Sequence, residues 1–237
     1  MEAAAKFHGQ VVLVTGGTGA LGSAVACAFL QQGANVAVTY RARQEYEQLQ
    51  SSLSSERAQL RGYQADVTSE AEMQRAVAAV MAEFHRLDGL VNSAGGYSGG
   101  TKLWEMESGV LERMLALNLR SAFVSSRSVL PIFLKQGSGC IVNVAARSAL
   151  DPPAGAGAYV ASKAAALALM HSLAMDLEGT AIRVNSVLPN IIDTAANRRD
   201  MPHANFASWT KPDAIARVIL FLCTPDAQAI NGAAIPV

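Results

Sequence analysis

A short apolar run that leads into a glycine-rich turn constrains the fold of this chain more than any other feature. Residues 11–14, Val-Val-Leu-Val, are typical of a buried strand. The turn over residues 15–22 follows at once, and residues 20–31 have helical character. In a strand–turn–helix unit of this kind, glycines let the backbone approach a pyrophosphate at the helix N-terminus. The sequence therefore predicts a dinucleotide site here, and a tight turn without a ligand is the alternative.

The rest of the chain repeats this alternation of strand and helix. With 237 residues, of which 51% are hydrophobic, it can bury one sizeable α/β core. Hydrophobic patterns predict strands at 11–15, 35–40, 61–66, 88–93, 139–145, 181–188 and near 233–236, and helices at 20–32, 43–54, 70–85, 108–134, 157–178 and near 212–223. The alternation indicates an α/β fold, a single Rossmann-type doubly wound parallel sheet with helices on both faces. We expect residues 1–237 to form a single domain, with a loop near 189–212 over the active site.

Composition and charge exclude several classes of partner. The formal net charge is zero and the chain has no basic run, so we expect no nucleic-acid partner. The N-terminal residues carry no apolar block, which predicts that there is no signal peptide, and no uninterrupted apolar stretch reaches membrane-spanning length. Cys27, Cys140 and Cys223 are far apart in the sequence and are expected to be free thiols, as in a reducing compartment. We therefore predict a cytoplasmic protein without a membrane partner.

Tyr159 and Lys163 are the candidate catalytic residues. Their spacing of four places both side chains on one face of the predicted helix, one turn apart. Moving a tyrosine pKa from about 10 to about 7 requires roughly 4 kcal/mol. A cation about 4 Å away, at an effective dielectric constant near 20, supplies about that amount. We therefore expect Lys163 to lower the pKa of Tyr159 and make the phenol a proton donor near neutral pH.

Further segments occur in a fixed order around this pair. They are Asp66-Val67, Asn92 to Gly95, Asn118, Pro189 and Thr194. Together with the turn and the pair, they resemble the short-chain dehydrogenase/reductase family over nearly the whole chain. The resemblance implies an NAD(P)-dependent oxidoreductase in which Tyr159 donates a proton, Lys163 holds the nicotinamide ribose, and Asn118 holds a proton-relay water. The cofactor-binding residues that it implies are Gly16, Thr18, Ala20, Leu21, Gly22, Arg41, Asp66, Val67, Asn92, Ala94, Gly95, Lys163, Pro189, Ile192 and Thr194.

One residue of the family pattern is absent. Members of the family have a serine thirteen residues before the tyrosine, which donates a hydrogen bond to the substrate carbonyl. Counting back from Tyr159 gives Ala146, which cannot donate. The loss of one such donor typically costs about 3 kcal/mol of transition-state stabilisation. Ser148, two positions further on, could replace the serine if the chain bends there.

The rim of the predicted active site resembles one branch of the family, the dihydropteridine reductases. That branch shares alanine at the positions of Ala20 and Ala146, and its loop and substrate-side segment resemble residues 94–100 and 193–210. The substrate residues that we predict are Tyr97, Ser148, Met201 and Trp209, with Trp104 as a further candidate for an apolar wall. The preferred acceptor is then a quinonoid dihydropterin. The alternative is a carbonyl reductase or alcohol dehydrogenase, acting on a ketone or 3-oxoacyl thioester, and a second alternative is a non-catalytic dinucleotide-binding sensor.

The end of the second predicted strand bears on the choice of cofactor. An acidic residue there would bind the ribose hydroxyls of NAD, whereas an arginine can neutralise the 2′-phosphate of NADP. Arg41 and Arg43 occur at this point, and no acidic residue precedes Glu45. We therefore predict NADP as the preferred cofactor, with NAD possible and a solvated arginine as the alternative reading. The four histidines have no second ligand at a metal spacing, so no metal site is predicted.

Two of the predicted helices carry more apolar surface than one sheet face can cover. Residues 164–170 are apolar nearly all round, and the helix at 108–134 has a similar stripe. A partner chain would bury the second face of each helix. We expect a homodimer or homotetramer that acts on a small-molecule substrate, and burial within one chain is the alternative.

Overall fold

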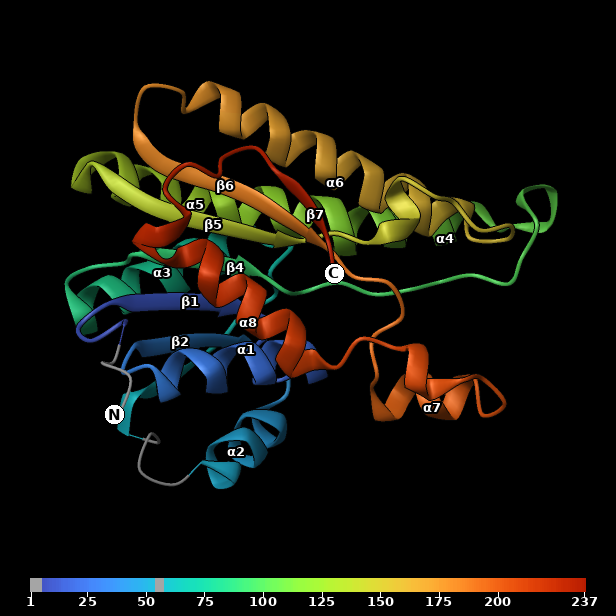
Figure 1. The fold of residues 1–237 in the computed structure, drawn as a ribbon, viewed down its shortest axis with the longest axis horizontal. Coiled ribbons are helices and arrows are strands. Elements are labelled where there is room, and N and C mark those ends of the chain that lie inside the picture. The colour runs from blue at the N-terminus through green and yellow to red at the C-terminus, as the bar shows by residue number, and fades with distance from the viewer. Residues whose placement is uncertain (1–5, 54–57) are drawn as a thin grey trace.

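The computed structural model describes residues 6–53 and 58–237. Residues 1–5, which were part of the signal-peptide prediction, and residue 54, the last of the predicted helix 43–54, lie outside the described residues. The rest forms a seven-stranded sheet with helices on both faces (Figure 1). This arrangement confirms the predicted α/β fold class.

The sheet is parallel throughout, in the order β3-β2-β1-β4-β5-β6-β7. Its strands are β1 Val11–Thr15, β2 Asn35–Tyr40, β3 Leu60–Gln64, β4 Gly89–Asn92, β5 Ser138–Val144, β6 Ala181–Leu188 and β7 Ala234–Pro236. The helices are α1 Ala20–Gln31, α2 Arg43–Ser52, α3 Glu70–Phe84, α4 Ser108–Met114, α5 Ser121–Gln136, α6 Gly157–Asp176, α7 Ala195–Asp200 and α8 Pro212–Cys223.

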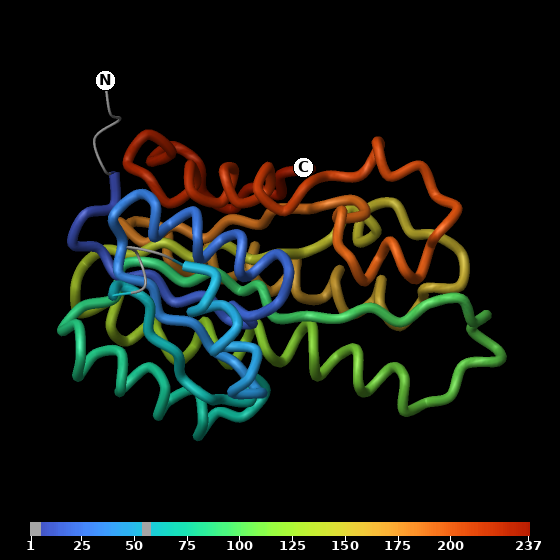
Figure 2. Tube along the Cα trace, turned by 90° about the horizontal axis from the view of Figure 1, so that it is seen from below, coloured from blue at the N-terminus to red at the C-terminus, as the bar shows by residue number. Residues whose placement is uncertain are grey.

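Alternation along the strands divides the core into two layers. In β1, Val12 and Val14 pack with α1 and α8 on one face, whereas Val11 and Leu13 pack with α3, α5 and α6 on the other. Figure 2 shows the sheet between these two sets of helices. All five residues of β1 are buried, as expected for a strand that is covered on both faces.

The strand order reverses direction between β1 and β4. From β1 the chain winds outward to β2 and β3, then returns to place β4 on the other side of β1. Crevices in doubly wound sheets open at such a switch point, outside the carboxyl ends of the strands. The glycine turn after β1 and the loop after β4 therefore face the same crevice.

Two predicted segments differ in the structure. The helix predicted at 108–134 is divided into α4 and α5 by a π-helical segment, Leu115–Arg120. The extra residue per turn in a π-helical segment redirects a side chain, and such segments are frequent at functional sites. The predicted loop at 189–212 contains α7 and a 3₁₀ helix, Phe206–Ser208, because Thr194 and Asn205 each cap a short helical turn.

Helix α6 combines length with high apolarity. Among the described residues, it is the one helix long and apolar enough to cross a membrane by those two criteria. The core helix of a globular protein passes the same test, and α6 packs on β6 and carries the buried Lys163. Its composition is therefore weak evidence for a membrane span.

Candidate active site

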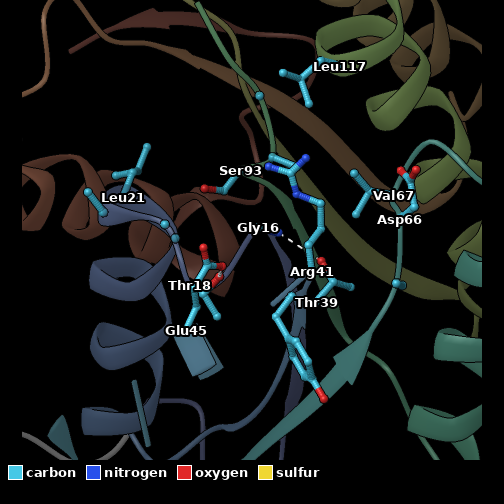
Figure 3. A pocket seen from close by; sticks show the side chains of 17 residues that line it. Gly16, Thr18, Leu21, Thr39, Arg41, Glu45, Asp66, Val67, Ser93 and Leu117 are labelled. Atoms are coloured by element: carbon cyan, nitrogen blue, oxygen red, sulfur yellow. Dashed lines mark hydrogen bonds between the residues drawn. The ribbon is translucent and has the colours of Figure 1, made fainter. Parts of the chain in front are cut away.

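A pocket of about 330 Å³ opens at the carboxyl ends of the first four strands. The glycine turn forms one wall, and the ends of β2 and β3 form another (Figure 3). It is lined by Gly16, Thr18, Gly19, Ala20, Leu21, Gly22, Thr39, Tyr40, Arg41, Glu45, Ala65, Asp66, Val67, Ser93, Ala94, Gly95 and Leu117. Most of the predicted cofactor-binding residues therefore lie together in one pocket.

The glycine turn brings the backbone against the next loop. Gly16 has a φ of +62°, and a Cβ added there would lie 2.9 Å from the Cα of Ala94. Its amide donates to the Thr39 hydroxyl at 3.0 Å, which fixes the turn to β2. Gly19 precedes α1 without a side-chain cap, so the amides of the first helical turn have no side-chain partner and meet the pocket. These features fit the pyrophosphate of a dinucleotide, because a helix N-terminus attracts anions.

Charged side chains lie on opposite walls of the pocket. Arg41 and Asp66 lie on the wall formed by the ends of β2 and β3, where the Arg41 side chain extends towards Ser93, and Glu45 lies beside Thr18 on the wall of the glycine turn (Figure 3). The backbone amide and hydroxyl of Thr68 donate to Asp66 and hold the pKa of its carboxyl below the usual value. Glu45 accepts a hydrogen bond from the Thr18 hydroxyl at 3.0 Å. The pocket therefore presents one guanidinium and two carboxylates.

Several predicted cofactor-binding residues do not line this pocket. The Asn92 amide donates to Ser126 at 3.0 Å and ties β4 to α5. The Pro189 carbonyl accepts from the Arg147 amide, Ile192 bridges to Thr210, and Thr194 caps α7. Arg43 forms an ion pair with Glu47 and is also outside the pocket lining.

Lys163 is buried next to the dinucleotide pocket. Its ammonium donates to the Val144 carbonyl at 2.8 Å, and its side chain is 7% exposed. Burial alone lowers its pKa to about 8. A Cβ added to Gly95, which lines the pocket, would lie 3.2 Å from the Lys163 Nζ and 2.8 Å from the Asn118 Oδ1. Glycine at this position therefore lets the pocket reach the lysine.

The Asn118 side chain joins three parts of the site. It lies in the π-helical segment and is buried. Its Oδ1 accepts from the Gly96 amide at 2.9 Å, and its Nδ2 donates to the Gly96 carbonyl at 3.0 Å. The same Nδ2 donates to the Ser162 hydroxyl at 2.9 Å, and that hydroxyl donates to the Tyr159 carbonyl at 2.7 Å. Asn118 thus fixes the loop after β4 to the helix that carries Tyr159 and Lys163.

The pKa of Tyr159 shifts in the direction opposite to our expectation. Burial raises it above the usual value, the Ser148 hydroxyl partly offsets the rise, and Tyr97 adds to it. Lys163 is not among the causes of the shift, and its ammonium donates to the Val144 carbonyl. The prediction that Lys163 lowers this pKa was wrong for this arrangement. The phenol is therefore fully protonated at neutral pH.

Ser148 lies near the Tyr159 phenol. Ala146 ends the extended segment after β5, and a 3₁₀ helix, Arg147–Ala149, begins at once. This turn is the bend that brings Ser148 to Tyr159. The Ser148 Oγ is buried and has no hydrogen-bond partner of normal geometry among the described residues, yet it lies close enough to lower the pKa of the phenol. A buried hydroxyl without a hydrogen-bond partner of normal geometry therefore lies beside the Tyr159 phenol.

The other predicted substrate residues differ in their surroundings. Tyr97 packs edge-to-face on Tyr159, with ring centroids 4.9 Å apart. Trp209 is 9% exposed and packs on Phe206, three positions before it in the chain. Met201 ends α7 and is half-buried. Of these three side chains, Tyr97 is the one in ring contact with Tyr159.

Some residues of the site carry no signal that the sequence alone reveals. Thr39 holds the glycine turn, Glu45 meets Thr18 across 27 positions of sequence, and Ser162 links Asn118 to α6. Each is a common polar residue whose partner is distant in the chain. The spacing of Ser162, three positions after Tyr159, is the one clue that places it on the same helix.

Comparison with known proteins gives consistent matches. A family model described as short chain dehydrogenase matches residues 10–205. The chain is 33% identical to a 2-(R)-hydroxypropyl-CoM dehydrogenase of Xanthobacter autotrophicus, over 95% of this chain and 96% of the relative. It is 33% identical to a D-threitol dehydrogenase of Mycolicibacterium smegmatis, over 96% of this chain and 91% of the relative. It is 28% identical to a 3-oxoacyl-(acyl-carrier-protein) reductase of Thermotoga maritima, over 96% and 95%.

Solved structures match over nearly the whole chain. The crystal structure of gox2181 superposes with a TM-score of 0.93 at 29% identity, covering 99% of this chain and 96% of the other. A xylitol dehydrogenase bound to NAD+ has a TM-score of 0.90 at 27% identity, covering 98% of each chain. ElxO bound to NADP has a TM-score of 0.91 at 26% identity, covering 96% of each chain.

Proposed function

The chain belongs to the short-chain dehydrogenase family, and on this premise we propose that it is an NAD(P)-dependent alcohol dehydrogenase or carbonyl reductase. The observation that carries the proposal is the Ser148 hydroxyl, buried beside the Tyr159 phenol without a hydrogen-bond partner of normal geometry. Two hydroxyl donors that converge beside a nucleotide pocket suit a carbonyl oxygen on which negative charge develops. The chemistry of the named relatives, which are dehydrogenases and a 3-oxoacyl reductase, agrees with this.

Each residue of the site has a role in this reaction. The nicotinamide cofactor supplies the hydride when bound. Tyr159 donates its phenolic proton to the carbonyl oxygen, and Ser148 donates a hydrogen bond to the same oxygen. Burial raises the Tyr159 pKa, so the phenol holds its proton at neutral pH and has it to donate. Lys163 contributes positive charge, and Asn118 holds the Gly96 loop against α6.

The dihydropterin acceptor that the sequence favoured is the weaker reading. It depended on Ala146, which removes the donor that an ordinary ketone requires. If the Ser148 hydroxyl, which lies near the Tyr159 phenol, acts as the donor in place of Ala146, the argument for an activated acceptor loses its main support. The named relatives act on alcohols and 3-oxoacyl groups rather than on pterins. The carbonyl alternative therefore fits better. We also propose that the enzyme is cytoplasmic.

A direct assay separates these readings. We would follow NADPH and NADH oxidation by purified protein with a panel of ketones, a 3-oxoacyl thioester and a quinonoid dihydropterin. Turnover of ketones or the thioester with little on the pterin supports the proposal. Rapid turnover of the pterin alone would contradict it and restore the first prediction.

Replacing the proposed donor gives a sharper test. We expect Ser148→Ala to lower kcat for ketone reduction by about 10²-fold, because one oxyanion donor is lost. Cofactor affinity should not change, since Ser148 does not line the dinucleotide pocket. Steady-state kinetics checks this, and Ser138→Ala, at the other end of β5, is the control. Unchanged ketone turnover in Ser148→Ala would show that another group polarises the carbonyl.

Arg41 is the residue through which we propose a preference for NADP. Its side chain lines the pocket, and no ion pair with it is present among the described residues. We expect Arg41→Ala to raise the Kd of NADPH by about tenfold or more and to change that of NADH little, because Coulomb attraction to the 2′-phosphate is lost. Fluorescence titration measures both constants. Arg43→Ala is the matched control, since Arg43 pairs with Glu47. Equal effects on both cofactors would contradict the assignment.

We propose that the apolar groove between α5 and α6 is covered by a second copy of this chain. Phe123, Leu130, Leu169 and Leu173 line it. Light scattering should give two or four times the chain mass of 24.8 kDa. Phe123→Glu should release monomers, because a charge would be buried in the interface. Leu134→Glu, on an exposed position of α5 outside the groove, should not. A monomeric unsubstituted chain would contradict the proposal.

A further inference from the structure

Large apolar side chains are exposed next to the catalytic tyrosine. Tyr97 is 66% exposed, Leu103 76%, Trp104 79% and Leu150 61%. Contiguous exposed apolar surface on a folded protein usually marks a binding site. We call these four residues the apolar rim.

The rim comes from two segments that touch. One follows β4 and the other follows β5. The Thr101 amide donates to the Gly155 carbonyl at 3.2 Å. A Cβ added to Gly157 would lie 3.9 Å from the Leu103 Cδ1, and one added to Gly155 would lie 3.6 Å from Gly100. The segment that carries Tyr97, Leu103 and Trp104 is therefore in contact with the segment that follows Leu150.

This region continues directly into the catalytic site. The Tyr97 ring packs on the Tyr159 ring, with an interplanar angle of 71°. Leu150 follows immediately after the 3₁₀ helix that carries Ser148. A molecule whose carbonyl lies between the Tyr159 and Ser148 hydroxyls therefore has the apolar rim beside it. A second copy of the chain is a weaker candidate occupant, because the long apolar groove lies elsewhere, between α5 and α6.

We propose that the apolar rim binds the apolar body of the substrate, so that this enzyme prefers ketones or secondary alcohols with a bulky aliphatic or aromatic group. The inference rests on the proposed function and narrows its substrate class. It distinguishes this chain from relatives named for small polar alcohols, such as threitol. Lys102 lies over the Trp104 ring, 5.4 Å from its centroid, and helps to hold the indole in place.

A series of methyl ketones tests the inference. We expect kcat/KM for 4-phenyl-2-butanone to exceed that for butanone by about tenfold or more. The larger ketone buries more apolar surface on the rim, and that burial stabilises the bound substrate. Trp104→Ala and Leu150→Ser should each lower kcat/KM for the larger ketone about fivefold or more by raising its KM. The kcat/KM for butanone should stay within about twofold of that of the unsubstituted chain. Leu134→Ala, at an equally exposed leucine of α5, is the control. A preference for butanone, or equal losses on both ketones, would overturn the inference.

A binding measurement keeps this test separate from the proposed function. Trp104 is exposed and Trp209 is buried, so a ligand on the rim should shift the indole emission to the blue through Trp104. We expect this shift on adding 4-phenyl-2-butanol, and its loss in Trp104→Phe. If no ketone is reduced but the shift occurs, the proposed reaction fails and the binding site stands. If ketones are reduced without the shift, the rim is not the substrate site. A change in oligomeric mass in Trp104→Ala would assign the rim to a second copy instead.

Discussion

Tyr159→Phe should reduce turnover by about 10³-fold, because the variant lacks the proton that the carbonyl oxygen must receive. The ring and its contact with Tyr97 are retained, so the change removes one hydroxyl from an otherwise intact site. The Kd for NADPH should stay within about twofold, since Tyr159 is not among the residues that line the dinucleotide pocket. Steady-state kinetics and cofactor titration together measure both quantities.

A second tyrosine provides the control for this variant. Tyr63, on β3, donates to Glu83 of α3 and does not line the pocket, so Tyr63→Phe should retain full turnover. Retained turnover in Tyr159→Phe would contradict the assigned role. A chain that binds NADPH but turns over no acceptor before or after the substitution would match the non-catalytic sensor that the sequence left open.

The glycine turn and the alternation of strands and helices were predictable because their signals are local. Residues 11–31 contain a largely β-branched strand, the glycines of the turn and a helix. These local features are enough to predict the wall of the pocket. The alternation of strand and helix then indicates a parallel sheet, since parallel neighbours require crossovers. Gly16, with its positive φ and its contact with Ala94, shows why glycine is required at this turn.

The surroundings of the catalytic groups could not be predicted in this way. The bend that brings Ser148 to Tyr159 is a single 3₁₀ turn without a sequence period. The π-helical segment that carries Asn118 interrupts a helix whose apolar pattern continues. The pKa of Tyr159 depends on burial by segments that are far apart in the chain. The hydrogen bond from the Lys163 ammonium to the Val144 carbonyl likewise joins residues that are 19 positions apart. These features arise from tertiary packing, which local patterns do not encode.

We expect the buried Lys163 to lower the free energy of unfolding of this chain. Burial lowers its pKa to about 8 from the ordinary 10.5, and no carboxylate is among the causes of the shift. A shift of this size corresponds to about 3 kcal/mol of cost to the folded state wherever the lysine is charged. The folded state binds fewer protons than the unfolded state between about pH 8 and 10.5. The contribution of Lys163 to the free energy of unfolding therefore rises with pH through that window, and the cost is fully present at pH 7.

Lys163→Met should therefore stabilise the protein at pH 7 while it removes activity. Methionine fills similar space without charge, and leaving the Val144 carbonyl unpaired offsets part of the gain, so we expect a net increase of about 1–2 kcal/mol. That corresponds to a rise in Tm of about 3–6 °C for a domain of this size. Lys135→Met, at an exposed lysine, should change stability by less than about 0.5 kcal/mol. Thermal unfolding at pH 7 and pH 10 measures the effect, and the advantage of Lys163→Met should shrink at the higher pH. A variant less stable than the parent at pH 7 would contradict this prediction. It would show that interactions beyond the hydrogen bond to Val144 stabilise the buried ammonium, so that its charge does not destabilise the folded state.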